Sequence, residues 1–307
     1  MKQIQELTHA RLEPAIAGFP GLFTARQAER ASGGKTDVKY QFGDVELVCR
    51  AADRLLPSDL LTLAALVALA GPGRQEPAER DKALVCDLAI EPPAAAEGTL
   101  VVETHAGRLL SECGRRDGGE QRARLRDGLR RLAGLVVFVK RGAQEVSMHL
   151  MSYTVDMKTG VLRVALSPRL SAAILGGRHV RIDIRELREL GEHALIIYVR
   201  LCTWIDPGRT RRVGIDALAE YLWPEPAQTA AGARKRRQRL RHAMAELGAL
   251  PGWRIGLDVR GRQYTVNRPG AAPAVVPVTP AVVPVTPAVV PVTPAVVPVT
   301  RECASSL

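Results

Sequence analysis

Residues 216–266 read DALAEYLWPEPAQTAAGARKRRQRLRHAMAELGALPGWRIGLDVRGRQYTV. Apolar residues at helical spacing predict a short helix over 216–223, which two prolines terminate. A longer helix is predicted over 233–250. The runs 253–259 and 262–266 alternate and predict a hairpin that turns at Arg-Gly. Short helix, turn, basic helix and hairpin is the order of a winged helix-turn-helix.

The long helix begins with ARKRRQRLRH, residues 233–242, in which six of ten residues are basic. Its second half has apolar residues at helical spacing, but its first half is basic all round. Such a cluster repels itself unless an anion lies alongside, and a helix N-terminus already favours phosphate. Arginine forks also fit guanine O6 and N7 in the major groove. We therefore predict DNA contacts here, against the alternatives of a solvated basic face or a localisation signal. The predicted contact residues are Arg234, Lys235, Arg236, Arg237, Arg239 and Arg241, with Arg260 and Arg262 at the hairpin turn.

The same order of elements occurs earlier in the chain. A helix over 104–114, capped by Thr104, is followed by a polar turn and a basic helix over 120–133. Strands are predicted over 135–140, 145–155 and 161–166. Glu120 and Asp127 dilute the basic helix, so a surface helix crossed by ion pairs is the alternative to groove contact. The predicted DNA-binding residues here are Arg122, Arg124, Arg126, Arg130 and Arg131, with Lys140 and Arg141 at the hairpin turn.

These patterns predict an α+β chain with two tandem winged helix-turn-helix domains, residues 1–177 and 178–270. The first has 24 basic and 21 acidic residues and the second 18 and 10, so the second should attract phosphate more strongly. Residues 271–307 form a low-complexity tail that contains PAVVPVT four times. Frequent proline favours polyproline II or disorder, and the tail is either a spacer or a docking arm.

Three local patterns predict further elements. Residues 38–48 alternate around Gly43-Asp44 and predict a hairpin. Ser58 is a candidate cap for a helix that Gly71 ends. Helices are also expected over 182–190 and 192–205.

Composition restricts the class of protein. The 307 residues are 46% hydrophobic with a net charge of +11, which predicts a packed core and an anionic partner, nucleic acid before membrane. The first thirty residues lack a secretory signal, and the longest apolar run, 60–70, is too short to span a membrane. The five cysteines form no CxxC, and no HxH or serine-nucleophile motif occurs. We expect no catalytic residues, no metal, no cofactor and a location in the bacterial cytoplasm.

Several scattered stretches carry a more specific resemblance, which runs from about residue 21 to residue 269. They are DVKY (37–40) with Gly43-Asp44, VALSP (164–168), HVRI (179–182), RLCTWIDPG (200–208), YLWP (221–224) and RKRRQR (234–239). The chain resembles the replication initiator protein C of IncQ-type plasmids, apart from its tail and its 72–103 region. The resemblance implies tandem winged helices that bind direct repeats (iterons) at a plasmid origin. It also implies origin opening, cooperation with a plasmid-encoded helicase and primase, and no enzymatic step.

Two other functions stay open. A transcriptional repressor with the same fold would bind an inverted repeat as a two-fold dimer. A nicking or priming enzyme would cut or extend DNA in the presence of Mg²⁺. A membrane-surface protein is least favoured, since a basic amphipathic anchor is lacking. The repeat sequence, the bases contacted, self-association and repression of the protein's own promoter are left open.

Overall fold

The computed structural model describes residues 8–25, 34–71 and 99–270. The sequence also predicts loops over 72–83 and 91–98 and a strand over 84–90. These stretches and the repeated tail lie outside the described residues. Within the described part, helices and antiparallel strands alternate, which confirms the expected mixture of helix and strand.

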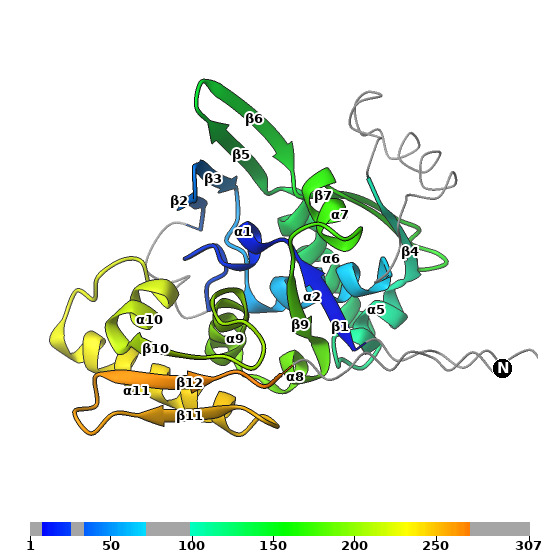
Figure 1. The fold of residues 1–307 in the computed structure, drawn as a ribbon. Coiled ribbons are helices and arrows are strands. Elements are labelled where there is room, and N and C mark those ends of the chain that lie inside the picture. Colours follow the sequence, from blue (N-terminus) through cyan, green and yellow to red (C-terminus); the bar gives the residue numbers. More distant parts are fainter. Residues whose placement is uncertain (1–7, 26–33, 72–98, 271–307) are drawn as a thin grey trace, which may run out of the picture. The chain divides into compact units, whose positions relative to one another are not determined.

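The second of the two similar units, here called the C-terminal repeat, lies within residues 178–270. It consists of three helices and a three-stranded antiparallel sheet of order β10-β12-β11 (Figure 1). Its elements are α9 (Glu192–Trp204), β10 (Thr210–Gly214), α10 (Ile215–Leu222), α11 (Ala230–Gly248), β11 (Arg254–Leu257) and β12 (Gln263–Asn267). The predicted short helix, long helix and hairpin are confirmed. Helix α11 starts earlier than predicted because the Thr229 hydroxyl accepts a hydrogen bond from the Gly232 N–H at 3.0 Å. Strand β10 was not predicted.

The N-terminal repeat has the same order of elements, except that two further strands, over 136–141 and 144–149, come between its third helix and its hairpin. They are α2 (Pro57–Leu69), β4 (Val101–His105), α5 (Ala106–Glu112), α6 (Gly119–Ala133), β7 (Met151–Val155) and β8 (Val161–Leu166). Its sheet has the order β4-β8-β7. In both sheets, the strand before the helices pairs with the second strand of the hairpin. The β7–β8 hairpin is therefore the counterpart of the β11–β12 hairpin.

The predicted strand over 145–155 is wrong as a single strand. It divides at Leu150 into β6 (Gln144–His149) and β7. The Leu150 N–H bonds to the Leu135 carbonyl, while the Leu150 carbonyl accepts from the Ser167 N–H, both at 3.0 Å. The chain therefore crosses between two sheets at this buried residue. Strand β6 pairs with β5 (Val136–Arg141) in a four-stranded sheet of order β2-β3-β5-β6.

Strands β2 (Thr36–Phe42) and β3 (Val45–Ala51) confirm the predicted hairpin. Gly43 at its turn has a φ of 63°, which favours glycine. Two predicted caps are wrong. Thr104 pairs with Leu162 inside β4, and at α2 the Asp59 carboxylate accepts from the Leu56 N–H at 2.8 Å, so the cap lies before Ser58.

The expected helix over 182–190 starts later than predicted, because β9 (Val180–Asp183) pairs with β1 (His9–Leu12). The Asp183 carboxylate then caps α8 (Ile184–Glu189) by accepting from the Arg185 N–H at 2.9 Å. Two short helices, α1 (Pro14–Ala17) and α7 (Pro168–Ile174), complete the described elements.

One continuous core joins the two repeats, and residues up to Ala271 form one compact unit. Helix α2 contacts both α8 and α9, and the buried Glu112 of α5 accepts from Arg188 of α8 at 2.7 Å. Arg268, also buried, donates to the carbonyls of Cys202 and Ile205 and so satisfies the end of α9. The boundary at 177/178 follows the exposed Gly176-Gly177 pair and stays a proposal. Among the described helices, none combines the length and hydropathy needed to cross a membrane.

Candidate nucleic-acid interface

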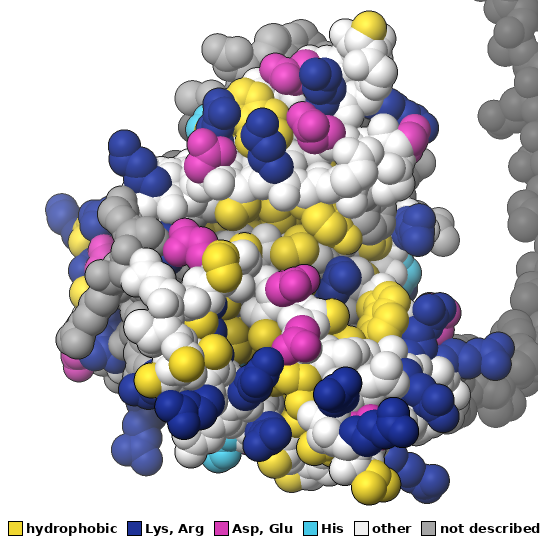
Figure 2. Space-filling model, turned by 90° about the vertical axis from the view of Figure 1, so that its left-hand side faces the viewer, with side chains coloured by type: hydrophobic (Ala, Val, Ile, Leu, Met, Phe, Trp, Pro, Cys, Tyr) yellow, Lys and Arg dark blue, Asp and Glu magenta, His cyan; other side chains and the backbone are white. Residues whose placement is uncertain are grey.

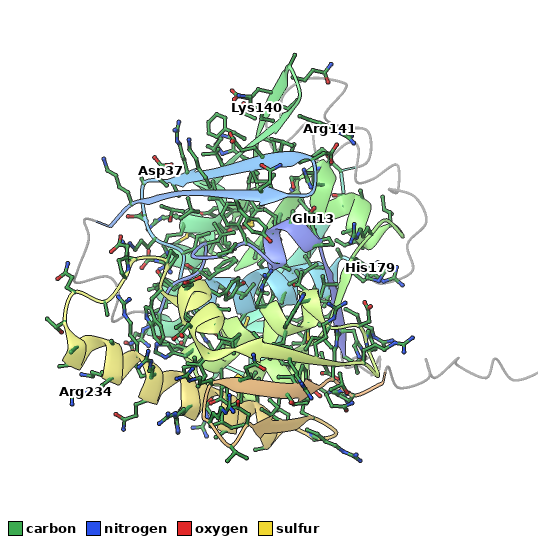
Figure 3. The ribbon with its side chains drawn as sticks, turned by 60° about the vertical axis from the view of Figure 1, so that its left-hand side comes forward. Glu13, Asp37, Lys140, Arg141, His179 and Arg234 are labelled. Carbon is green, nitrogen blue, oxygen red and sulfur yellow. The ribbon has the colours of Figure 1, made fainter. Side chains whose placement is uncertain are left out.

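Helix α11 is held by its C-terminal half and presents its N-terminal half outward. Leu240, Ala243, Met244 and Leu247 are buried in the core, whereas most of the basic residues before them are exposed. Figure 3 shows Arg234 at the free end of this helix. In Figure 2, Lys and Arg side chains gather on the lower part of one face, at the height where Figure 1 places α11 and its hairpin. The amphipathic division expected from the sequence is therefore present.

Arg234, Lys235 and Arg241 of α11 are exposed, and no described acidic residue forms an ion pair with them. Arg237 lies 3.5 Å from the Asp216 carboxylate, and both side chains are exposed. A surface pair of this kind contributes little stability, so its guanidinium is readily exchanged to another anion. These cations are available to phosphate without breaking the fold.

Arg236 of α11 contacts two residues that precede the helix. Its guanidinium donates to the Glu225 carbonyl and lies 5.6 Å from the centre of the Trp223 ring. These contacts attach the loop before α11 to the helix. Arg239 is half-buried beside His193. Burial lowers the pKa of His193, and the positive charge of Arg239 lowers it further. The His193 ring packs against Trp223, with the ring centres 5.4 Å apart.

Helix α6 has the same number of arginines as α11, but most of them are paired. Arg122 binds Asp117 at 2.6 Å, Arg124 binds Glu120, and Arg130 binds Asp127 at 3.0 Å. The hydrogen bond from the Arg122 side chain lowers the pKa of the Asp117 carboxyl. Helix α6 is thus a surface helix with ion pairs, and its contact with a DNA groove stays a prediction.

Arg131, one of the predicted DNA-binding residues, also forms part of the fold. It makes two 2.8 Å hydrogen bonds to Asp59, which is 1% exposed. Gly128 faces the same carboxylate, and a Cβ there would come within 2.8 Å of its oxygen. The helix therefore uses glycine and arginine together to cover a buried acid. The Nε and Nη2 groups of Arg131 are thereby engaged within the fold.

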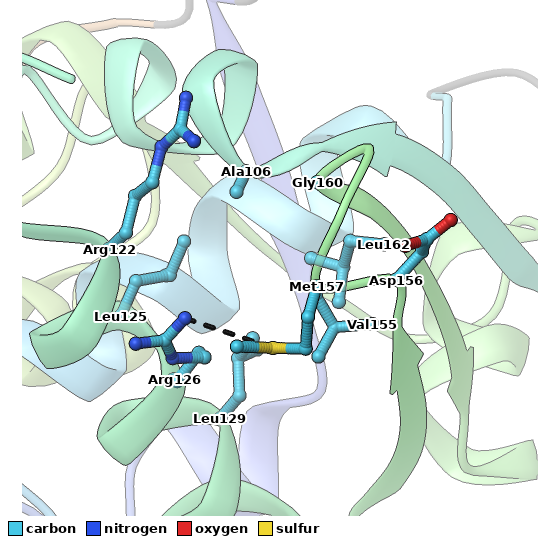
Figure 4. Close-up of a pocket in the computed structure, with 10 residues that line it drawn as sticks. All are labelled: Ala106, Arg122, Leu125, Arg126, Leu129, Val155, Asp156, Met157, Gly160 and Leu162. Carbon is cyan, nitrogen blue, oxygen red and sulfur yellow. Dashed lines mark hydrogen bonds between the residues drawn. The ribbon is translucent and has the colours of Figure 1, made fainter. Parts of the chain in front are cut away.

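Arg126 lies across a small apolar hollow between α6 and the β7–β8 turn. Its Nη1 donates to the Met157 Sδ at 3.8 Å, above Leu125 and Leu129 (Figure 4). Lys158 is the next residue of that turn and is exposed. The prediction missed Lys158 because it treated this turn only as the divider between two strands.

The two predicted basic hairpin tips are not equivalent. Lys140 and Arg141 lie on the β5–β6 hairpin of the four-stranded sheet, and Arg141 is paired with Asp44 at 2.7 Å. Figure 3 shows both residues at the opposite end of the view from Arg234. Arg260 and Arg262 instead belong to the hairpin that packs on α11. We therefore keep Arg260 and Arg262 and leave Lys140 and Arg141 out of the proposed interface.

A further basic surface lies on the unpredicted strand β10. Arg209, Arg211 and Arg212 line an open hollow together with Trp204. The Arg211 guanidinium lies 5.5 Å from the centre of the Trp204 ring. Trp204 is only partly buried, whereas Trp223 is buried. Two consecutive arginines after Asp-Pro-Gly were the available signal for this surface, although the polar sequence around them has no strand pattern.

Among the described residues, no three His, Cys, Asp or Glu side chains are placed to hold a metal ion. Burial raises the pKa of Cys49 and of Cys202 to about 12 and that of Cys113 to about 11. All three are protonated thiols at neutral pH.

Comparisons with known proteins place this chain in a family of replication proteins. The model of the family Replication protein C (RepC) matches residues 4–270. A crystal structure of domains 2 and 3 of RctB, a selenomethionine derivative, is similar with a TM-score of 0.54 and 11% identity, over 83% of this chain and 98% of that one. A second crystal structure of RctB domains 2–3 gives 0.50 and 11%, over 83% and 96%. At that identity the likeness concerns the fold. No curated protein sequence matches the chain.

Proposed function

The chain belongs to the replication protein C (RepC) family, and on that premise we propose that it initiates plasmid replication by binding repeated sequences in the duplex DNA of an origin. The observation that carries this proposal is the set of exposed cations on α11. Arg234 and Lys235 in its N-terminal half, and Arg241 directly after Leu240, form no ion pair with a described acidic residue. An unneutralised cluster on a core-anchored helix is complementary to a groove lined by phosphates.

We interpret the two repeats, residues 1–177 and 178–270, as tandem winged helix-turn-helix domains. Each has a helix pair followed by a hairpin whose second strand pairs with the strand before the pair. Helix α11 enters one major groove and α6 a second, about one turn or ~10 bp away. The hairpin turns then lie over the flanking backbone.

The two helices contribute unequally to this binding. The arginines of α11 gain phosphate contacts directly, whereas those of α6 must first leave Glu120 and Asp127. Each surface pair is worth at most about 1 kcal/mol, so the exchange is feasible but its net gain is small. Helix α11 supplies most of the affinity, in agreement with the greater positive charge of residues 178–270.

Several copies bound side by side on direct repeats would bend the adjacent DNA. A·T-rich steps unstack most readily, so melting begins there and admits a plasmid-encoded helicase and primase. The protein contributes binding energy and no bond-breaking step, in the bacterial cytoplasm where the plasmid resides. Permanganate should detect unpaired thymines beside the repeats, and plasmid incubated with the protein and Mg²⁺ should stay uncut.

The deciding experiment is a footprint of the full chain on the parent plasmid's origin. Protection of consecutive direct repeats is expected. Protection of a single inverted repeat would favour the repressor instead, because a two-fold dimer copies its symmetry onto its site.

Charge-matched variants connect the footprint to α11. Arg234→Ala/Lys235→Ala/Arg241→Ala should lower affinity for the repeats roughly 100-fold or more, since three phosphate contacts are lost. Lys35→Ala/Lys39→Ala/Lys140→Ala removes the same charge from exposed positions on or beside the four-stranded sheet and should change affinity little. Equal losses in the two variants would show that net charge, rather than α11, binds the DNA.

A further inference from the structure

Strand β10 is an edge strand, and no described strand covers its outer edge. The sheet order is β10-β12-β11, so β10 pairs on one side only (Figure 1). On that side the Arg209 carbonyl accepts from the Arg268 N–H at 3.0 Å. In an antiparallel ladder, alternate residues bond to the same neighbouring strand. The peptide groups of Thr210 and Arg212 therefore point to the uncovered edge.

This edge is accessible over residues 209–212. Its residues up to Arg212 are exposed, whereas Val213 and Gly214 are partly buried. Four extended residues span about 13 Å, which is enough to pair with a short strand of another chain. Uncovered N–H and carbonyl groups at this spacing are a template for the addition of a strand.

The same edge is cationic on both faces. The Arg211 guanidinium lies 5.5 Å from the centre of the Trp204 ring on one face, and Arg212 points to the other, because successive side chains of a strand alternate. Arg209, Arg211 and Arg212 form no ion pair with any described acid. Of the residues that line the hollow beside Trp204, only Asp206 is acidic. Both faces therefore attract an anionic group.

The uncovered backbone identifies the partner as a peptide. A nucleic acid would neutralise the arginines, but its phosphate oxygens are acceptors and would lie against the carbonyls of Thr210 and Arg212. An extended peptide supplies donors and acceptors in alternation, which is what this edge requires. A second copy of β10 is disfavoured, because its arginines would oppose these arginines. The added strand must therefore be acidic.

We propose that β10 binds an acidic segment of a partner protein, which adds to the β10-β12-β11 sheet as a fourth strand. Consecutive side chains of the added strand point to opposite faces. One acid thus meets Arg211 beside Trp204, and the next residue of the segment, also acidic, meets Arg212. Tryptophan and arginine are the residue types that contribute most to the affinity of protein interfaces.

The β10 edge lies apart from the proposed DNA contacts. Thr210 pairs with Asn267, at the end of β12 remote from the turn at Gly261, whereas Gly214 pairs with Gln263 near that turn. Helix α11 contacts β11, which is the opposite edge of the sheet. Binding of the acidic segment requires no DNA, so this inference goes beyond the proposed function.

A synthetic peptide tests the proposal on the full chain. The probe is acetyl-TVEEVT-amide with a fluorescein label, whose adjacent glutamates match the two cationic faces and whose β-branched residues favour a strand. Its fluorescence anisotropy should rise with protein concentration. The same peptide N-methylated at both valines keeps its charge but loses one paired N–H in either register, so it should bind about fivefold more weakly. The proposal is wrong if the unmodified peptide does not bind, or if both peptides bind equally.

A pair of substitutions at one position tests the role of the backbone. Thr210→Pro removes an outward N–H and leaves the hydrogen bonds to β12 in place, so it should weaken binding about fivefold. Thr210→Val keeps this N–H and should bind the peptide as the wild type does. Matching midpoints of urea unfolding show that both variants are folded, and the N-methylated peptide decides with the wild type if they are not. Equal affinities of the two folded variants would overturn strand addition.

Charge-matched variants test the role of the arginines. Arg209→Ala/Arg212→Ala should weaken binding of the peptide at least about tenfold. Lys39→Ala/Lys140→Ala removes the same charge from exposed positions of the four-stranded sheet and should change the affinity little. Equal losses would show that net charge alone attracts the peptide.

Oligonucleotides separate a peptide site from a nucleic-acid site. An excess of single-stranded or duplex DNA should leave the labelled peptide bound at physiological salt. Displacement of the peptide by either DNA would assign the β10 edge to nucleic acid and overturn the proposal. Peptide binding is measured without origin DNA, so its failure leaves the proposed function unaffected.

Discussion

At the scale of single residues, neighbouring arginines of α6 form ion pairs that differ in burial. Arg130 and Asp127 form an exposed pair, whereas Arg131 and Asp59 form a pair whose acid is almost completely buried. The side chain of Arg131 is itself only 19% exposed. Water screens the first pair and compensates for its loss, but a buried carboxylate without its partner has neither water nor a counter-charge.

Arg131→Ala should therefore lower the free energy of unfolding by about 3 kcal/mol, and Arg130→Ala by less than about 1 kcal/mol. Urea unfolding of the two variants measures the difference. The variants lie next to each other on one helix and remove the same charge, so each controls for the other. Equal losses would mean that the Asp59 pair does not stabilise the fold.

Glu186 of α8 gives a pH-dependent effect. Its carboxylate accepts from the Trp253 Nε1 at 3.2 Å, and burial raises its pKa above the ordinary 4.5. The fold thus favours the protonated form, so this contribution to stability is present below pH 4.5 and is lost as the pH rises through the raised value.

Glu186→Gln, which stays neutral and still accepts from Trp253, should be at least as stable as the wild type at pH 7. Its advantage should shrink as the pH falls toward 4. Glu189→Gln, on the exposed side of the same helix, should show no such trend. Urea unfolding between pH 4 and 7 measures this difference in stability. If the stability advantage of Glu186→Gln grew toward acid pH, the fold would lower the pKa of Glu186 instead of raising it.

At the scale of elements, α6 and α11 show that arginine content does not by itself define an interface. Both helices are rich in arginine, but acids lie three or four residues from the arginines of α6 and none does so in the N-terminal half of α11. Salt dependence separates these two situations, because only a cation that displaces counterions from DNA contributes to the slope.

Removing Arg234, Lys235 and Arg241 should reduce the slope of log K against log salt by about one for each residue. Arg124→Ala/Arg130→Ala should reduce it by less than two, because neighbouring acids on α6 already neutralise part of this charge. Fluorescence anisotropy over a salt series measures both slopes. Arg236 is unsuited to this test because its contact with Trp223 ties it to the fold. If the slope fell equally per residue in the two variants, the arginines of α6 and α11 would contribute equally to the binding of phosphates.

At the scale of the whole molecule, the question is whether residues 1–177 and 178–270 are independent. Strand β1 of the first part pairs with β9 of the second, and Arg188 of the second part donates a hydrogen bond to Glu112 of the first. Each part therefore contributes contacts that stabilise the other. The core that these contacts surround is continuous. Contacts of this kind couple the unfolding of two regions.

We expect one cooperative transition. All three tryptophans, at positions 204, 223 and 253, belong to residues 178–270, so their fluorescence reports that part alone. Far-ultraviolet circular dichroism reports helices of both parts. The two signals should give the same urea midpoint, whereas separate midpoints would show that the proposed domains unfold one at a time.

The sequence by itself determined the features that depend on neighbours along the chain. Helices α6 and α11 follow from apolar spacing, and the turns at Gly43 and Gly261 follow from a residue that tolerates positive φ. The resemblance to the replication initiator protein C family is likewise a property of short stretches, and the family match confirms it.

Only the tertiary structure decided the features whose partners are remote. Strands β4, β9 and β10 form because they meet β8, β1 and β12, and polar sequences such as TRRVG do not reveal this locally. Arg131 and Asp59 are 72 residues apart. Hydrophobic periodicity acts over a few residues, whereas strand pairing, buried ion pairs and the exposure of a cation depend on which distant segments the core brings together.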